Sequence, residues 1–490
     1  MTQAAAAPIG VATVRHTRVL VIGAGFAGLG MAMGLAREGR GDFIVLEKAG
    51  EVGGTWRENT YPGCACDVPS ALYSYSFERG DWDGVRARQP EILRYLRRAS
   101  EKYGVRGKIE FGVEVASARW DEAGGRWHLV TTAGEEYVAQ FLVAGTGALH
   151  LPKTPKVPGA TTFEGTAFHS SRWDHSVDLS GKRVAVIGTG ASAVQLVPEV
   201  VGKARSVQVY QRTPPWVLPS REWLPRARGS FAQRVARWGT YWGNETLAAG
   251  LNGHPALTRP LERRARRHLR RQVSEPRLRE VLTPDYRIGC KRILRSNTYY
   301  PALARPSTEV ISEPIAEIRP EGIVTDGGVL RPVDVIVYAT GFRVAGSLAR
   351  LPLVGRGGVT LQERWQRDGI RTHLGISVSG FPNAFFLTGP NTGLGHNSVV
   401  YMIEAQVRYA LRAMDLVDRE GARALDVRRD VQDAFHDDLH ARLATAVWST
   451  GGCSSWYVDG RGTNHSVWPG FSWQYRWRTR RVRRRDHDLF

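Results

Sequence analysis

The sequence predicts an α/β fold in which one Rossmann-type domain is inserted into another. Two glycine-rich turns, at 23–28 and 188–193, each lie between an apolar strand and a helical stretch that leads to a second strand. Two further apolar strands, at 137–147 and 334–342, also end in glycine turns. A repeated strand, turn and helix is typical of α/β proteins with a parallel sheet. We therefore expect two dinucleotide-binding units, with the two later strands returning the chain from one unit to the other.

The returning strands also set the predicted domain limits. We expect residues 1–150 and 341–490, the latter with a C-terminal segment, to form the first domain, and residues 151–340 to form the inserted one. Between about 220 and 285, apolar residues recur at spacings of three and four, which predicts an insertion of two amphipathic helices. Such a face packs against the protein or caps an apolar cavity. The positions are Phe231, Val235, Trp238 and Trp242 in the first helix, and Leu261, Ala265, Leu269 and Val273 in the second.

The composition is that of a compact globular protein. The chain has 490 residues, of which 42% are hydrophobic, enough for two or three domains with substantial cores. Its apolar runs have the length of strands, and its first 18 residues contain neither the apolar core of a signal peptide nor a membrane span. We therefore expect a cytoplasmic protein without a membrane-spanning segment. The sequence does not specify an oligomeric state.

The formal net charge is +20 and is carried mostly by arginine. A basic surface of this kind attracts nucleic acids or anionic membranes. The sequence has no zinc-finger spacing, no RNP-type aromatic motif and no basic heptad region. We therefore expect a solvated, arginine-rich surface and no nucleic-acid partner.

Cysteine is scarce. The four cysteines are Cys64, Cys66, Cys290 and Cys453, and the only close pair lies in "CAC". That spacing is neither the CxxC of a redox-active dithiol nor a zinc-binding pattern. We therefore expect neither a structural disulfide nor a metal site.

The first glycine-rich turn has the full dinucleotide-binding pattern. Gly23 permits the tight turn, Gly25 lets the backbone approach a pyrophosphate, and Gly28 lets helix and strand pack closely. The helix that follows begins at the turn, so its N-terminus faces the phosphate charge. Glu47 lies 24 residues after Gly23, where a carboxylate accepts hydrogen bonds from ribose hydroxyls. The first unit is therefore predicted to bind FAD.

The second turn differs at the position that selects the cofactor. Its glycines are Gly188 and Gly190, and Ala193 takes the third place, which the motif tolerates. Counting 24 residues from Gly188 leads to Arg212 in place of an acid, with Thr213 beside it. A guanidinium binds a 2′-phosphate through charge-assisted hydrogen bonds, whereas an acid would repel it. The second unit is therefore predicted to bind NADPH.

Between the two units lies "FEGTAFHSSRWD" at 163–174. Its residues alone predict only a packed linker. The segment resembles the fingerprint of the Baeyer–Villiger monooxygenases, FxGxxxHxxxW followed by Pro or Asp. Related flavin-containing monooxygenases that oxidise nitrogen and sulfur have tyrosine where this chain has tryptophan. The matching residues are Phe163, Gly165, His169, Trp173 and Asp174.

The resemblance covers nearly the whole chain. It includes segments similar to those that contact flavin, NADP and the reacting oxygen in that family, at 53–77, 211–219, 288–294, 389–406 and 454–460. It implies a class B flavoprotein monooxygenase in which NADPH reduces FAD and O₂ then forms a flavin C4a-peroxide. Attack on a ketone would give an ester or lactone. The alternative within the same fold is oxidation of an amine or thioether.

The resemblance implies the catalytic residues. Negative charge develops on the peroxide and then on the adduct, so the site needs a cation that keeps its proton, and arginine meets that need. Arg292, in "GCKR", is the implied cation, with Asp67 orienting it. We expect His169 and Trp173 to couple domain rotation to cofactor position, with a packed linker as an equal alternative.

Most of the residues expected to bind the cofactors lie in the two turns and the resembling segments. One departure is Arg57-Glu58, which replaces an aromatic that often follows "GGTW" in the family. The expected cofactor-binding residues are Gly23, Gly25, Phe26, Ala27, Gly28, Glu47, Gly54, Thr55, Trp56, Asp67, Tyr73, Val115, Val399, Thr189, Gly190, Ala191, Ser192, Ala193, Gln195, Arg212, Thr213, Lys291 and Trp456.

Two functions from other classes have less support in the sequence than a monooxygenase. A flavin disulfide reductase needs a CxxC or CxxxxC pair, which the chain lacks. A basic flavoprotein that binds nucleic acid would show binding to duplex DNA with a steep dependence on salt.

Overall fold

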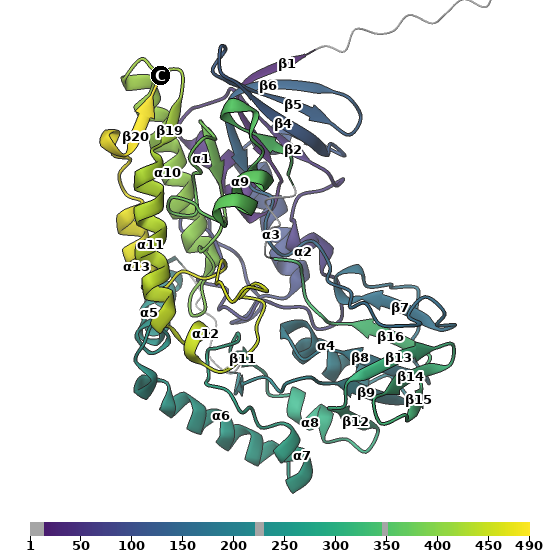
Figure 1. Ribbon diagram of the computed structural model, residues 1–490. Coiled ribbons are helices and arrows are strands. Elements are labelled where there is room, and N and C mark those ends of the chain that lie inside the picture. Colours follow the sequence, from purple (N-terminus) through teal and green to yellow (C-terminus); the bar gives the residue numbers. More distant parts are fainter. Residues whose placement is uncertain (1–13, 221–229, 345–350) are drawn as a thin grey trace, which may run out of the picture.

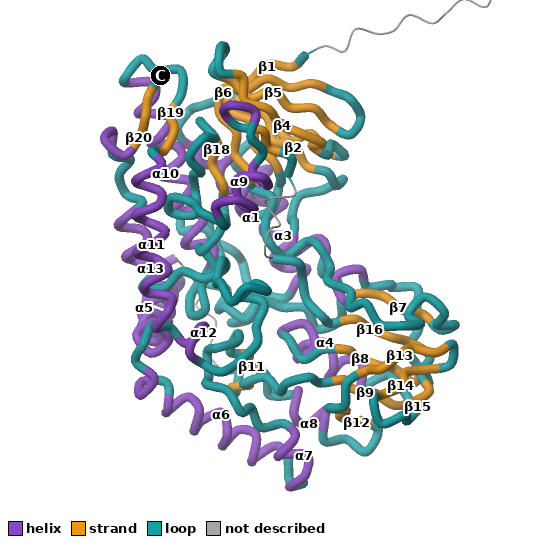
Figure 2. The backbone as a smooth tube through the Cα atoms, in the orientation of Figure 1, coloured by secondary structure: helices purple, strands orange, loops and turns teal. Residues whose placement is uncertain are grey.

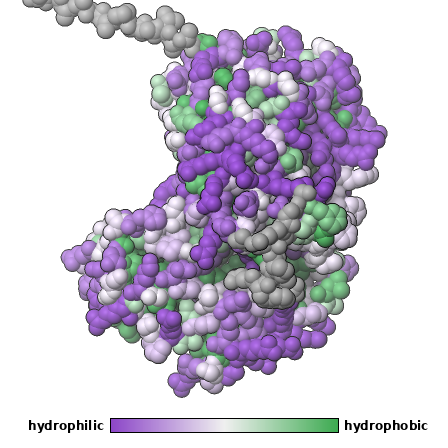
Figure 3. All heavy atoms as spheres, turned by 180° about the vertical axis from the view of Figure 1, so that it is seen from behind, coloured by the Kyte–Doolittle hydropathy of each residue, from purple (hydrophilic) through white to green (hydrophobic). Residues whose placement is uncertain are grey.

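The computed structural model describes residues 14–220, 230–344 and 351–490. Figures 1 and 2 show two lobes, each with a β-sheet, and a group of long helices along one side. The predicted α/β fold with two Rossmann-type domains is confirmed. Figure 3 shows hydrophilic residues over most of the face seen from behind, as a net charge of +20 leads one to expect.

The first lobe contains an eight-stranded sheet in the order β17-β4-β5-β6-β1-β2-β3, with β18 also pairing with β6. Parallel β1 lies between β2 and β6, and its Val21 pairs with Val45 and Val143. The strands are β1 (Arg15–Ile22), β2 (Phe43–Glu47), β3 (Ile109–Phe111), β4 (Val115–Asp121), β5 (Arg126–Thr131), β6 (Glu136–Ala144), β17 (Leu353–Val354) and β18 (Ala384–Phe386).

Helices cover this sheet and carry much of the site. The completely buried face of α1 packs against α10, and Met31, Met33 and Met414 lie in the shared core. The helices of this lobe are α1 (Phe26–Arg37), α2 (Thr55–Glu58), α3 (Gln89–Lys102), α9 (Leu361–Asp368) and α10 (Val399–Arg419), with 3₁₀ turns at Arg106–Lys108 and Arg356–Gly358.

The second lobe contains a five-stranded parallel sheet in the order β12-β9-β8-β16-β7. All its strands lie between residues 166 and 338, whereas those of the first sheet lie at 15–144 and 353–386. The strands are β7 (Thr166–His169), β8 (Arg183–Ile187), β9 (Ser206–Tyr210), β12 (Thr308–Ile311) and β16 (Val335–Tyr338). Around them lie α4 (Ala191–Val201), α8 (Tyr299–Leu303), a 3₁₀ turn at Ser170–Arg172 and an antiparallel sheet of β13 (Ile315–Arg319), β14 (Gly322–Thr325) and β15 (Leu330–Pro332).

The predicted insertion is helical, but only one of its apolar faces is covered. In α6 (Arg259–Gln272) the residues Ala265 and Leu269 are buried, and Val273 just beyond it is buried too. In α5 (Ser230–Leu251) the aromatic face is exposed, so the alternative that it packs against the protein is wrong and the alternative that it caps a cavity stays a prediction: periodicity identifies an apolar face but not what covers it. Its residues are Phe231, Val235, Trp238 and Trp242, exposed by 74, 51, 67 and 44%. The insertion also contains a 3₁₀ turn (Pro255–Leu257) and α7 (Pro276–Val281), and the parallel strands β10 (Val217–Leu218) and β11 (Leu294–Arg295) pair at its two ends.

The C-terminal segment packs along the first lobe. It contains β19 (Leu425–Val427), α11 (Arg429–Thr445), α12 (Val447–Thr450), α13 (Ser472–Arg478), a 3₁₀ turn (Arg484–Asp486) and β20 (His487–Leu489), and β19 pairs with β20. Within the described ranges, no helix has both the length and the apolar character needed to span a bilayer.

The expectation of no structural disulfide is wrong. Cys290 and Cys453 form a disulfide across 163 residues of sequence, whereas Cys64 and Cys66 are buried free thiols. Spacing rules read close pairs along the chain, and this pair is brought together only by the packing of the C-terminal segment against the inserted domain.

Candidate active site

The first glycine-rich turn has the geometry that a pyrophosphate requires. Gly23 has φ of 95°, and a Cβ on Gly28 would lie 1.7 Å from the Gly23 carbonyl oxygen. Gly25 caps α1, and a Cβ there would lie 3.6 Å from the Cα of Gly54. Two glycines therefore face each other at the helix N-terminus, where a bulkier residue would crowd the approach of a phosphate. Phe26 and Ala27, the first residues of α1, are buried beneath it.

Glu47 ends β2 and holds this turn in place. Its carboxylate accepts hydrogen bonds from the backbone N–H of Ala24 at 2.7 Å and of Ala49 at 3.0 Å. Arg57 donates to the same carboxylate at 3.2 Å. The contact of Glu47 with a ribose stays a prediction.

The departure at Arg57-Glu58 has a structural role. The guanidinium of Arg57 pairs with Glu58, which in turn pairs with Arg172. Arg172 lies between His169 and Trp173 of the fingerprint segment. The two residues that replace the aromatic therefore tie the turn region to the linker between the lobes.

Three of the predicted aromatic residues form one cluster beside the turn. The indole N–H of Trp56 donates to the hydroxyl of Tyr73 at 3.1 Å, and their ring centroids are 5.7 Å apart. Phe26 lies 5.1 Å from Tyr73, edge to face. Thr55 begins α2 directly before Trp56, while Val115 and Val399 are the first residues of β4 and α10.

Asp67 and Arg292 are brought together across the two domains. The Asp67 carboxylate accepts from Nε of Arg292 at 2.7 Å and from its second nitrogen, Nη2, at 2.9 Å. Burial opposes ionisation of Asp67, but the charges of Arg292 and Arg86 hold its pKa below the ordinary value. Burial alone would lower the pKa of Arg292. The negative charge of Asp67 and its hydrogen bonds have the larger opposite effect, so the pKa of Arg292 lies above the ordinary value. The pair is therefore ionised, and its cation is fixed.

A backbone carbonyl that sequence reasoning missed completes the surroundings of Arg292. Nη1 of the guanidinium donates to the carbonyl of Leu394 at 2.8 Å. Tyr457 also faces this pair, and burial raises the pKa of its hydroxyl, so it stays protonated. A carbonyl partner carries no side-chain signature, so sequence motifs do not reveal it.

The second glycine-rich turn is also shaped for a phosphate. Gly188 has φ of 117°, and a Cβ there would lie 2.4 Å from the carbonyl oxygen of Ala339. Gly190 caps α4 and has open space where its Cβ would be. The hydroxyl of Thr189 donates to the carbonyl of Thr213 at 2.9 Å, which ties the turn to the end of β9. Ala191, Ser192 and the fully buried Ala193 form the first turn of α4.

Gln195 contacts the other domain. Its amide oxygen accepts from the Tyr61 hydroxyl at 2.9 Å, and its amide nitrogen donates to the carbonyl of Ala65 at 2.8 Å. Both polar atoms are thus engaged between the domains, and a cofactor contact for Gln195 stays a prediction.

Arg212, Thr213 and Lys291 gather at the end of β9. The ammonium group of Lys291 donates to the hydroxyl of Thr213. Burial and the neighbouring charge of Arg212 lower the pKa of Lys291. Two positive side chains that repel each other beside a hydroxyl group form a suitable site for a dianion such as a 2′-phosphate. The negative charge of the phosphate would offset the repulsion between the two cations.

His169 lies at the crossing between the domains, and its hydrogen bonds do not reach the Asp67–Arg292 pair. The backbone N–H of Ser171 donates to its Nδ1 at 3.1 Å, so the proton is on Nε2, which donates to the carbonyl of Gly341 at 3.0 Å. Burial lowers its pKa and keeps the ring neutral. His169 therefore joins the two strands that connect the domains, and Trp173 packs edge to face on Phe168.

Trp456 is half exposed, with its ring 4.3 Å from that of Tyr457. It therefore presents an aromatic surface next to the residue that faces Arg292.

Sequence reasoning also missed a buried acid. The Glu245 carboxylate on α5 is 2% exposed and accepts hydrogen bonds from Asn397 at 2.7 Å and from the backbone N–H of Ser472 at 3.0 Å. His396 lies 3.2 Å away. Burial raises the pKa of Glu245, but these donors outweigh it, and the pKa is lowered. The sequence does contain a sign of this residue, since Glu245 is an acidic residue close to the aromatic face of the same predicted helix. Glu245 thus anchors the loop that carries Leu394.

Two dinucleotide-binding turns, one in each lobe, and an ionised arginine–aspartate pair between the domains define an oxidoreductase with two nucleotide sites. Residues 20–237 match the family model described as pyridine nucleotide-disulphide oxidoreductase. A Baeyer-Villiger monooxygenase of Pseudomonas aeruginosa is 46% identical over 96% of this chain and 90% of its own.

Solved structures of monooxygenases have the same fold as this chain. An oxidized steroid monooxygenase bound to NADP superimposes with a TM-score of 0.87 and 31% identity, covering 97% of this chain and 99% of that one. The monooxygenase OTEMO in complex with FAD and NADP gives a TM-score of 0.86 with 28% identity, covering 98 and 100%. The chain belongs to the Baeyer–Villiger monooxygenase family, which confirms the resemblance.

Proposed function

We propose that this protein uses FAD and NADPH to insert one oxygen atom of O₂ next to a ketone carbonyl, giving an ester or lactone. The observation that carries the proposal is the Asp67–Arg292 pair, a fixed cation where the two nucleotide domains meet. Family membership supports the reaction, and the relatives solved with NADP or with both cofactors support the choice of cofactors. Bound FAD, once reduced by NADPH, supplies the activation of O₂.

The residues of the chain then have distinct roles. Arg292 keeps its positive charge throughout and stabilises oxygen-centred negative charge as it develops in the reaction. Asp67 and the carbonyl of Leu394 accept hydrogen bonds from all three guanidinium nitrogens, so the cation is oriented before the reaction begins.

The chain must retain NADP⁺ after NADPH has given its hydride to the flavin, because water that enters the site would lead to hydrogen peroxide instead of product. Arg212, Thr213 and Lys291 would bind the 2′-phosphate of NADP⁺, and Trp456 would cover its nicotinamide half. The glycine at 190 leaves open space for the pyrophosphate.

We also propose that residues 151–340 form the NADP-binding domain within a FAD-binding domain of residues 1–150 and 341–490. His169 couples the two, because its ring links the strand that enters the inserted domain to Gly341 at the exit. Since NADPH is an intracellular reductant, the enzyme works in the cytoplasm.

The test is product analysis. The purified protein should be yellow, and with NADPH and O₂ it should convert members of a ketone panel to products that are 16 Da heavier and identified as esters or lactones by mass spectrometry. Thioethers and amines serve as the parallel panel. Oxidation of those compounds alone would refute the ketone assignment and favour heteroatom oxygenation.

A further inference from the structure

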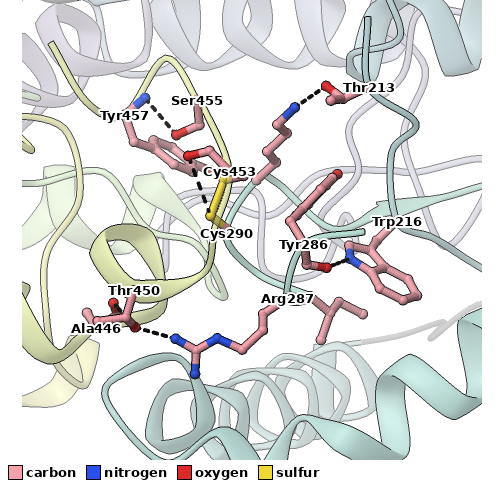
Figure 4. The surroundings of a disulfide bond; sticks show 12 residues. Thr213, Trp216, Tyr286, Arg287, Cys290, Ala446, Thr450, Cys453, Ser455 and Tyr457 are labelled. Atoms are coloured by element: carbon pink, nitrogen blue, oxygen red, sulfur yellow. Dashed lines mark hydrogen bonds between the residues drawn. A yellow bond between two sulfur atoms is a disulfide. The ribbon is translucent and has the colours of Figure 1, made fainter. Parts of the chain in front are cut away.

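The Cys290–Cys453 disulfide links two segments that the proposed mechanism uses. The cation segment, residues 287–292, carries Lys291 and Arg292. The cofactor loop, residues 451–458, carries Trp456 and belongs to the C-terminal part of the chain. The Cα atoms of the two cysteines are 6.1 Å apart, and Figure 4 shows the bond bridging the two ribbons.

The disulfide lies among a few close contacts. The backbone N–H of Arg287 donates to the carbonyl of Gly451 at 3.0 Å, and the Arg287 guanidinium donates to Thr450. A Cβ on Gly451 would lie only 2.7 Å from that of Cys290, so the close approach of the two segments requires glycine there. Past Cys453 the loop's hydrogen bonds are local: Ser455 accepts from the N–H groups of Tyr457 and Val458.

Each cysteine lies close in sequence to residues with a proposed role. Cys290 directly precedes the phosphate-binding Lys291 and the cation Arg292. Cys453 lies three residues before Trp456, and three residues of extended chain span at most ~11 Å. A covalent bond between the cysteines therefore limits how far Trp456 can move from the cation segment.

We propose that the Cys290–Cys453 disulfide is a positioning element of the reaction: when closed, it holds the cofactor loop over bound NADP⁺ and beside Arg292, and its reduction loosens the loop. The inference rests on the proposed function. A dithiol reductant opens the bond by giving two electrons and two protons to the two sulfurs and becoming a disulfide itself. Hydrogen peroxide closes it, taking two electrons and two protons and leaving two molecules of water.

The two sulfurs differ in access. Cys290 is completely buried, whereas Cys453 is partly exposed at the surface of the loop. A reductant thiolate therefore attacks Cys453 first and leaves Cys290 as the departing thiol. In the cytoplasm, where disulfides are usually transient, the Cys290–Cys453 bond would open or close with the redox state of its surroundings.

The bond itself is tested by counting thiols in denatured holoenzyme with a maleimide. Air-oxidised protein should label at two cysteines, Cys64 and Cys66, and protein treated with dithiothreitol should label at four. Peptide mapping without reductant should recover Cys290 linked to Cys453. Four labelled cysteines in the oxidised protein would overturn the proposal.

Its role is tested by two readouts taken on oxidised and reduced holoenzyme: the dissociation constant of NADP⁺, and hydrogen peroxide released per NADPH consumed. Ordering of a freed loop weakens binding by up to about tenfold, so we expect reduction to raise the dissociation constant by ~3–10-fold and to increase peroxide. Re-oxidation should restore both values. Cys453→Ser is the control: it should match the reduced wild type and not respond to dithiothreitol.

The outcomes separate the tether from the proposed function. If reduction lowers only the melting temperature, with affinity for NADP⁺ and peroxide release unchanged, the disulfide stabilises the fold without positioning the loop, and the proposal is wrong. If Cys453→Ser still responds to the reductant, another group is responsible and the proposal is wrong. Because neither readout needs a ketone, an effect of reduction in an enzyme that oxidises only thioethers would overturn the ketone assignment and support the tether.

Discussion

Replacement of Arg292 by alanine removes the one side chain on which the proposed reaction most depends. Its guanidinium makes two hydrogen bonds to Asp67 and one to the carbonyl of Leu394. The other residues proposed to bind FAD and NADPH are unchanged in this variant, and hydride transfer creates no oxygen-centred charge. Arg292→Ala should therefore bind both cofactors and still reduce the flavin, though more slowly, but should fail at oxygenation.

Two effects set the magnitude. Loss of one preorganised donor at a developing oxyanion typically costs ~10²–10³-fold in rate. The substitution also leaves the Asp67 carboxylate without its main partner, which costs ~3–5 kcal/mol of stability in a fully buried site. The side chains of Arg292 and Asp67 are 29 and 26% exposed, so we expect the lower end, about 3 kcal/mol. Adding Asp67→Asn should recover most of this stability, because it removes the unpaired charge.

The assay combines rapid mixing with product analysis. Reduced Arg292→Ala should react with O₂, return the NADPH consumed largely as hydrogen peroxide, and form no detectable ester. Arg277→Ala, on the exposed surface of α7, is the matched control and should retain wild-type activity. The double variant Asp67→Asn/Arg292→Ala should be more stable than Arg292→Ala and equally inactive in oxygenation. Oxygenation of a ketone by Arg292→Ala at the wild-type rate would require another cation for the mechanism.

Three further predictions follow from the same structure. Arg212→Ala and Lys291→Ala should each raise the Michaelis constant for NADPH and leave that for NADH almost unchanged; equal damage with both cofactors would contradict the phosphate assignment. Glu245→Ala should lower the free energy of unfolding by about 3 kcal/mol in urea, because several buried donors lose their acceptor, whereas the exposed Glu280→Ala should have little effect. Burial lowers the pKa of His373 to about 3, below its value in the unfolded chain, so its contribution to stability is present above pH 6.5 and is lost as pH falls. Between pH 8 and pH 5 the free energy of unfolding should fall by ~2 kcal/mol because of His373. His373→Gln should flatten this dependence of the free energy of unfolding on pH.

The sequence by itself determined the two nucleotide units. Gly23 and Gly188 are needed at positive φ, and Gly28 is needed where helix and strand touch. These constraints act within some thirty residues of chain, so they leave a local pattern that can be recognised. The prediction that Arg212 and Thr213 bind the 2′-phosphate arises in the same way, because the position that selects the cofactor lies at a fixed distance from the turn.

Only the tertiary structure decided the long-range contacts. The bidentate ion pair of Arg292 with Asp67 spans 225 residues of sequence. The hydrogen bond from Asn397 to Glu245 spans 152, and the disulfide spans 163. The exposed face of α5 belongs here too, since a helical period is the same whether its apolar face is covered or open. Local patterns report the torsions and faces of neighbouring residues, whereas these contacts depend on how whole domains pack, and no spacing along the chain records that packing.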